Sequence, residues 1–188
     1  RSRGLGDVYK RQDILVLVGD LVEKGRDSLA TLRYIMELSA THTVYALCGN
    51  CDNLAVDFIY GNGELGRDFY RFYLSVWGER ALILQMAAEA GMEVRGPGDL
   101  PGLRMLLLER FRSELEFLRS LPTILESEHL VFVHGGVPSY AHMEELDAWQ
   151  CMKNDDFLGQ GRVFPKYCVV GHLSLIHISE PTRPISIS

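Results

Sequence analysis

The sequence lacks the features that mark several classes of protein. Among its 188 residues are only four cysteines, Cys48, Cys51, Cys151 and Cys168, too few for a disulfide scaffold and typical of reduced thiols in cytosol. The 19 Lys and Arg are outnumbered by 25 Asp and Glu, so we expect no nucleic acid as partner. No apolar run approaches the ~20 residues that cross a bilayer. We therefore expect a soluble, cytoplasmic protein with no membrane partner.

The two ends differ in composition from the rest of the chain. Residues 1–12 (RSRGLGDVYKRQ) are basic and show no apolar period, and residues 173–188 (LSLIHISEPTRPISIS) contain two prolines. Both resemble translated adapter or vector sequence, so we expect them to be non-native tails. A natural disordered tail is the alternative for each end. The domain is then expected to span residues 13–172.

A strand, a helix and a second strand begin this domain. Residues 13–19 (DILVLVG) form a nearly continuous apolar run, typical of a strand buried on both faces. Apolar residues recur at close to helical spacing over 27–40, where Asp27 or Ser28 is the expected N-cap. Residues 43–47 (TVYAL) predict the next strand. This order indicates a parallel crossover unit and an α/β fold.

The pattern changes in the middle of the chain. Residues 54–124 predict a mainly helical insertion, rich in Tyr, Phe and Leu. An amphipathic run over 68–91 is broken by Gly78, residues 96–102 predict a loop, and residues 103–121 predict one helix. Helices packed on the sheet are the plain interpretation of this region. A lid over a binding site is the functional one.

Polar side chains follow four predicted strands, the last two over 129–133 (HLVFV) and 167–170 (YCVV). These polar residues are Asp20, Asn50, His134 and His172. Because ligands bind beyond the carboxyl ends of strands in open α/β sheets, we expect the side chains to converge. Taken singly, such an Asp is often a turn former, and such a His a packed core residue. As a set they suit manganese, iron or zinc better than calcium.

Short motifs around these residues resemble those of a known family. GDLVEKG (19–25) is similar to the GDxVDRG motif of calcineurin-like metallophosphoesterases, in their phosphoprotein phosphatase (serine/threonine phosphatase-like) branch. GNCD (49–52) resembles the GNHD or GNHE motif of the family, and HGG (134–136) and VGH (170–172) resemble the remaining two. The resemblance implies a β-sandwich flanked by helices, which we expect to be incomplete at both ends and to carry the helical insertion.

The resemblance also implies a metal-dependent phosphoesterase. It assigns Asp20 as the bridging ligand of two divalent metal ions (Mn, Fe or Zn). Asn50, His134 and His172 would complete the coordination of the second ion. A metal-bound hydroxide would then attack the phosphorus of a phosphate ester or anhydride, in line with the leaving group. The expected substrate is a phosphorylated small molecule or a phosphoprotein.

The active-site motifs depart from the family pattern. Cys51 takes the place of the catalytic histidine, and Glu23 and Lys24 replace the Asp and Arg of GDxVDRG. We predict catalytic roles for Cys51, Asp52 and Glu23, and substrate binding by Lys24 and Arg162. A solvated charge is the plain alternative for Arg162. Because a thiol, with a pKa of ~8.5, protonates an alkoxide less well than imidazole does, we expect a preference for good leaving groups.

Two further motif elements of the family fall outside the predicted domain. An Asp-x-His motif is expected before Asp13, and another histidine would fall within residues 173–188. We therefore expect this chain to bind at most one metal well and to have impaired activity. A non-catalytic phosphate-binding module of the same fold is one alternative. A less favoured alternative is a thiol-disulfide oxidoreductase, because Cys48 and Cys51 form a CxxC motif.

Overall fold

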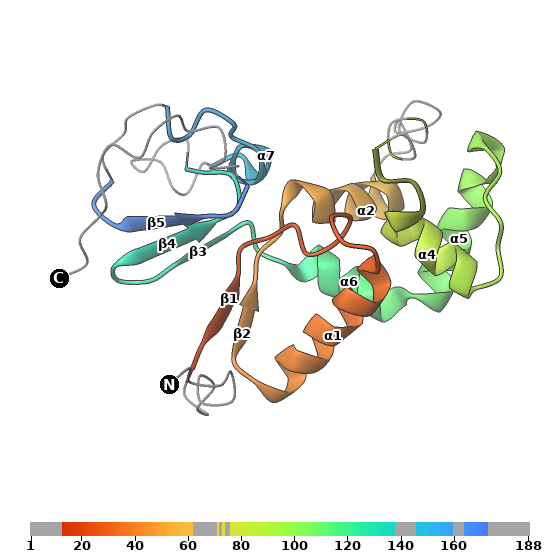
Figure 1. Cartoon of the computed structure of the whole chain (residues 1–188), viewed down its shortest axis with the longest axis horizontal. Coiled ribbons are helices and arrows are strands. Elements are labelled where there is room, and N and C mark those ends of the chain that lie inside the picture. Colours follow the sequence, from red (N-terminus) through yellow and green to blue (C-terminus); the bar gives the residue numbers. More distant parts are fainter. Residues whose placement is uncertain are drawn as a thin grey trace, which may run out of the picture.

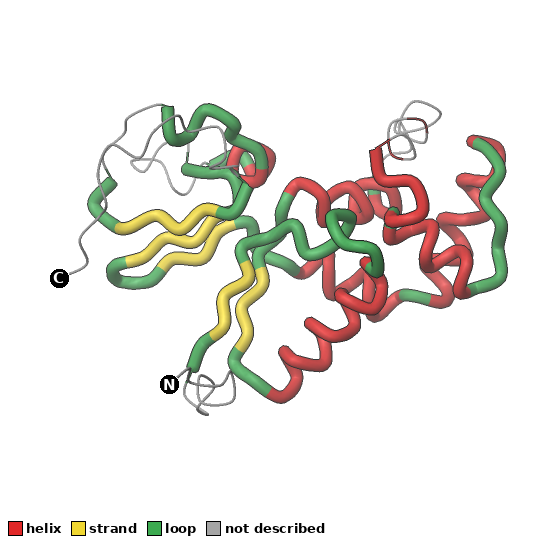
Figure 2. The backbone as a smooth tube through the Cα atoms, in the orientation of Figure 1, coloured by secondary structure: helices red, strands yellow, loops and turns green. Residues whose placement is uncertain are grey.

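A computed structural model of the chain shows a mixed α/β fold, as predicted (Figure 1). It describes residues 13–61, 71, 73, 76–137, 146–159 and 164–172. Most helices gather on one side, a three-stranded sheet lies on the other, and a two-stranded sheet lies between them (Figure 2). The predictions on residues 1–12 and 173–188 concern segments outside the described residues.

The central sheet is the predicted crossover unit. Strand β1 (Leu15–Leu17) pairs in parallel with β2 (Val44–Ala46), and helix α1 (Ser28–Thr41) connects them. Asp27 is the N-cap of α1, since its carboxylate accepts a hydrogen bond of 3.0 Å from the Ala30 N–H. The strand order and the cap therefore confirm the sequence prediction.

The second sheet contains the two later predicted strands and one that was not predicted. Strand β4 (Leu130–Val133) pairs in parallel with β5 (Tyr167–Val170). Strand β3 (Ile124–Glu126) pairs antiparallel with β4 on its other edge. The short helix α7 (Ala148–Met152) lies between β4 and β5 in the sequence.

The helical part differs from the prediction in two places. Helix α2 (Asn50–Tyr60) is followed by a 3₁₀ turn η2 (Gly78–Arg80), α4 (Leu82–Glu89) and a 3₁₀ turn η3 (Pro97–Asp99); α5 (Leu100–Arg110) and α6 (Arg112–Ser120) come next. The single helix expected over 103–121 is wrong, because the chain breaks at Phe111, whose φ is −123°. The loop expected over 96–102 is also wrong beyond Asp99, because Pro101 fits the first turn of α5, where its missing N–H is not needed.

Among the residues that the structure describes, two hydrophobic cores of unequal size support this arrangement. The larger one joins α1, α2, α4, α5 and α6, and it includes Leu32, Leu107 and Leu115, all fully buried. The smaller one lies on the three-stranded sheet and contains Val131, Val133, Val137, Cys151 and Phe157. None of the helices in the described part of the chain has the length and apolar composition needed to span a bilayer.

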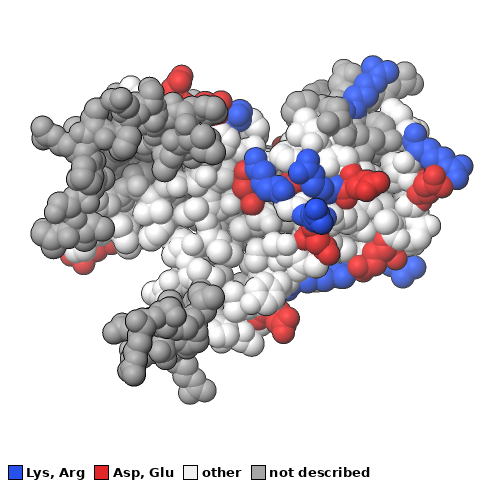
Figure 3. All heavy atoms as spheres, in the orientation of Figure 1, with Lys and Arg blue, Asp and Glu red and all other residues white. Residues whose placement is uncertain are grey.

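Charged side chains of both signs lie next to one another over the helical part (Figure 3). Arg33 on α1 binds Glu89 on α4 through two hydrogen bonds of 2.8 and 2.9 Å. Its Nε also donates to Glu114 on α6 at 2.9 Å. This network ties the first crossover helix to the helical insertion.

Candidate metal centre

Asp20 follows β1 at a point where two loops touch. The preceding Gly19 has a φ of +87°, and a Cβ there would lie 2.7 Å from both the Gly49 nitrogen and His134 Nδ1. A Cβ on Gly49 would lie 2.3 Å from the Asp20 nitrogen. Both positions therefore need glycine, since any side chain would push the loops apart. The Cys51 N–H completes the contact by donating to Asp20 Oδ1 at 3.1 Å.

Asn50 is the first residue of α2 and lies in the same contact region. Its Oδ1 is buried and has no hydrogen-bond partner among the described residues. A buried carbonyl oxygen without a partner is costly, because it loses its hydrogen bond to water and gains none. The oxygen is therefore available to a ligand such as a cation.

His134 directly follows β4, and its side chain contacts the loop after β1 in the other sheet. Its ring is 1% exposed, and Nδ1 donates to the Val18 carbonyl at 2.7 Å. Since that carbonyl can only accept, Nε2 carries the lone pair of the neutral ring. Nε2 is 3.2 Å from Asp20 Oδ1 but has no hydrogen-bond partner in the described part of the chain. A lone pair that faces a carboxylate is unfavourable unless a proton or a cation lies between them.

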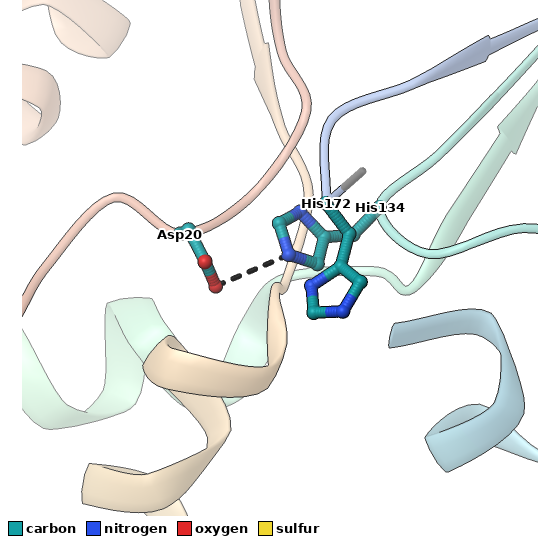
Figure 4. A group of neighbouring side chains, drawn as sticks. All are labelled: Asp20, His134 and His172. Carbon is teal, nitrogen blue, oxygen red and sulfur yellow. Dashed lines mark ion pairs between the residues drawn. The ribbon is translucent and has the colours of Figure 1, made fainter. Parts of the chain in front are cut away.

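His172 follows β5 and lies beside His134. Its backbone N–H donates to the His134 carbonyl at 2.8 Å, and the two rings make an edge contact with centroids 5.1 Å apart. The ligand atoms of Asp20, His134 and His172 lie within 4.8 Å of one another. Figure 4 shows the two imidazole rings next to each other, with Asp20 facing them. The structure thus brings together three of the predicted metal ligands, and Asn50 lies next to them along the contact of Gly49 with Asp20.

The protonation of this group responds to the same contacts. Burial raises the pKa of Asp20. Its contacts with His134 and with the Cys51 N–H outweigh burial, and they hold the pKa of this carboxyl well below its usual range. Burial lowers the pKa of His134, but its contacts with Asp20 and Val18 outweigh this and raise it overall. A carboxylate beside two imidazoles is a donor set that fits a divalent transition metal or zinc.

Two predicted catalytic carboxylates, those of Asp52 and Glu23, are not among the converging ligand atoms. Asp52 is fully buried and accepts from the N–H groups of Leu21 at 2.8 Å, Val22 at 3.2 Å and Gly49 at 2.8 Å. Burial raises its pKa to about 6. The carboxylate thereby joins the loop after β1 to the loop after β2. Its catalytic role stays a prediction.

Glu23 is also fully buried and faces the helical insertion. It has a φ of 73° and accepts hydrogen bonds from the Tyr73 hydroxyl and from the Leu82 N–H, the latter at 3.2 Å. Burial raises its pKa to about 7, against the opposing effect of those bonds. Among the described contacts, Glu23 therefore anchors the loop after β1 to the helices, and its catalytic role likewise stays a prediction.

The two cysteines of the CxxC motif have the wrong environment for redox chemistry. Both are buried and unpaired. Burial and the charge of Asp52 raise the pKa of Cys48 to about 12, and burial and the charge of Asp20 raise that of Cys51 to about 12. Reactive thiols need a lowered pKa and access to solvent. The oxidoreductase interpretation is therefore disfavoured.

Of the two predicted substrate-binding residues, Lys24 and Arg162, only Lys24 lies among the described residues. Lys24 Nζ is 3.4 Å from Asp20 Oδ2 and 5.2 Å from the ring centroid of Trp77, and its side chain is 56% exposed. It can therefore reach an anion beside the metal group. Arg162 lies outside the described residues.

One further contact involves a residue that no sequence motif identifies. Asp155, in the turn after α7, accepts a hydrogen bond from His172 Nε2 at 2.8 Å. Asp155 belongs to a polar stretch (KNDD) with no strand end or glycine beside it, so the sequence carries no signal for this role.

Comparison with known families agrees with the geometry. The sequence model of the calcineurin-like phosphoesterase family matches residues 4–174. The chain belongs to the calcineurin-like phosphoesterases. This membership implies metal-dependent hydrolysis of phosphoesters in general, and the predicted resemblance to the wider family is confirmed. No curated protein matches the sequence significantly.

Proposed function

We propose that the chain carries a metal centre that hydrolyses phosphate esters or anhydrides, in the phosphoprotein phosphatase branch of the family. The observation that supports this most directly is the meeting of Asp20, His134 and His172 at the ends of three strands from two sheets. A divalent ion held there would polarise a phosphoryl oxygen and lower the pKa of water enough to supply a nucleophile. We favour manganese, iron or zinc, since nitrogen and carboxylate ligands suit them.

The protein residues would bind and orient the substrate around that ion. Lys24 would neutralise a phosphoryl oxygen as a point charge, and the buried Asp52 would hold the loop that presents both Asp20 and Lys24. Asp20, His134 and His172, together with Asn50, would hold one ion. A second ion sharing Asp20, as we expect from the family motifs, would need ligands beyond these four. We therefore propose that the chain by itself has impaired activity.

The proposed substrate is a phosphorylated small molecule or a phosphoprotein, in the cytoplasm, where the four unpaired thiols would stay reduced. With Cys51 in the position of the family histidine, protonation of the leaving group is weak. We therefore expect p-nitrophenyl phosphate to be hydrolysed faster than an alkyl phosphate such as ethyl phosphate. Equal rate constants for the two substrates would contradict this preference.

Titration calorimetry with Mn²⁺, combined with hydrolysis of p-nitrophenyl phosphate, tests the proposal. Replacing His134→Ala removes a buried ligand and should weaken Mn²⁺ binding at least about 10-fold and abolish Mn²⁺-dependent hydrolysis. His129→Ala is the matched control, because that imidazole is 78% exposed just before β4 begins and should leave binding unchanged. Equal Mn²⁺ affinity in both variants would reject the metal site.

Cys51, Glu23 and Lys24 differ from the residues of the family motifs. These differences favour a second candidate function, a phosphate-binding module that has lost catalysis. The internal hydrogen bonds of Glu23 agree with it, since a carboxylate bonded to Tyr73 and Leu82 does not face the metal group. Binding of Mn²⁺ and inorganic phosphate, with no hydrolysis of p-nitrophenyl phosphate, would establish this alternative.

A further inference from the structure

The turn after α7 is fitted closely against the chain segment that follows His134. The Gly135 N–H donates to the Cys151 carbonyl at 2.6 Å. A Cβ on Gly135 would lie 2.8 Å from the backbone nitrogens of Lys153 and Asn154, and one on Gly136 would lie 2.5 Å from the Phe157 ring. The two glycines of the HGG motif therefore let residues 153–157 approach the histidines.

This close fit places a carboxylate on the outer side of His172. Asp155 Oδ1 is 2.8 Å from His172 Nε2, while Asp155 Oδ2 is 3.2 Å from Lys153 Nζ. The His172 side chain is 13% exposed and that of Asp155 is 66% exposed. The carboxylate thus lies at the rim of the site, and it contacts the imidazole at Nε2.

A carboxylate in this place selects one form of the imidazole. Because it only accepts hydrogen bonds, it favours the tautomer with the proton on Nε2, which leaves the lone pair on Nδ1. Histidines that bind metals commonly donate their second N–H to a carboxylate, which fixes the ring orientation and makes the ligand nitrogen more basic. Lys153 adds a second contact that keeps the Asp155 side chain in place.

We infer that Asp155 is a positioning residue of the metal centre, which holds His172 in the tautomer and orientation needed to bind a cation. The inference rests on the proposed function, because it gives His172 the role of a metal ligand. Asp155 itself lies outside the group of ligand atoms that converge within 4.8 Å. Its contribution is therefore expected in the affinity of the site rather than in the number of ligands.

Calorimetry with Mn²⁺ on the full chain provides the first test. Asp155→Ala should weaken Mn²⁺ binding by about 10- to 100-fold. Asp155→Asn should recover part of this loss, because the amide oxygen still accepts from Nε2–H. Asp156→Ala is the matched control, since Asp156 is exposed in the same turn and should bind Mn²⁺ like the parent chain.

Long-range proton–nitrogen spectra of the metal-free, ¹⁵N-histidine-labelled protein supply a readout that a purely structural role would not change. The parent chain should show His172 with its proton on Nε2, and Asp155→Ala should show a mixture of tautomers. A comparison with His172→Asn identifies the signal. Parent-like Mn²⁺ affinity and an unchanged tautomer in Asp155→Ala would overturn the inference and leave the proposed function intact. No Mn²⁺ binding by the parent chain would overturn both.

Discussion

Asp20 and Asn50 belong to the part of the chain that packs on the helices, whereas His134 and His172 belong to the three-stranded sheet. The first pair is held by buried carboxylates, since Asp52 and Glu23 bind backbone N–H groups of neighbouring segments. The second pair is held by close packing at glycines, and five buried residues among those that the structure describes form the core next to it. The comparison predicts that loss of a buried carboxylate lowers the stability of the first half of the site most, whereas added bulk at a glycine lowers that of the second.

The largest effect is expected at Asp52, the centre of the carboxylate half. Asp52→Ala removes the acceptor of three N–H groups, of which those of Val22 and Gly49 are buried, so the free energy of unfolding should fall by roughly 3 to 5 kcal/mol. Urea denaturation at pH 7 measures this change. Asp57→Ala on the same helix is the control, because Asp57 is partly buried and accepts one hydrogen bond, from Asn53. Equal losses in the two variants would contradict the special role of Asp52.

An intermediate effect is expected at Glu23, and it depends on pH. Its pKa in the folded protein is about 7, above the usual 4.5, so the folded state holds a proton that the unfolded state has released. The free energy of unfolding should therefore fall by roughly 3 kcal/mol as the pH rises through this interval.

Glu23→Gln keeps the shape and removes the titration. The variant should match the parent chain near pH 4.5 and exceed its stability at pH 8, as measured by urea denaturation across this range. The difference between the two proteins isolates Glu23, since Asp52, with a raised pKa of about 6, titrates in both. A pH-independent difference would show that folding does not raise the pKa of Glu23.

The smallest of these effects is expected in the histidine half. Gly135→Ala places a methyl group 2.8 Å from backbone atoms of the turn after α7, and moving that turn should cost about 1 to 2 kcal/mol. Gly25→Ala is the control, because no atom of the described residues, apart from Gly25 and its two chain neighbours, lies within 4 Å of the place that its methyl group would take. Thermal melting of both variants measures the difference, and an unaffected Gly135→Ala would mean that close packing does not hold this half.

The polar residues at the strand ends could be predicted from the sequence. The helix break and the side-chain contact that support them could not. Apolar runs before Asp20 and His134 mark strands whatever the tertiary context. The break between α5 and α6 falls at Phe111, which is neither Gly nor Pro and is 3% exposed, so packing in the core rather than local preference sets it. The contact of Asp155 with His172 depends on how α7 packs against β4, and no local pattern encodes it.

The left-handed backbone after β1 has a consequence for moving this centre into another protein. Gly19, Asp20 and Glu23 have φ values of +87°, +55° and +73°. For the two residues with side chains this conformation costs about 1 to 2 kcal/mol each, which the surrounding fold must offset. A graft of the loop alone onto a foreign scaffold would relax and turn the aspartate away. A transplanted site must therefore include α2 and the helical segment that hydrogen-bonds Glu23, as well as the loop itself.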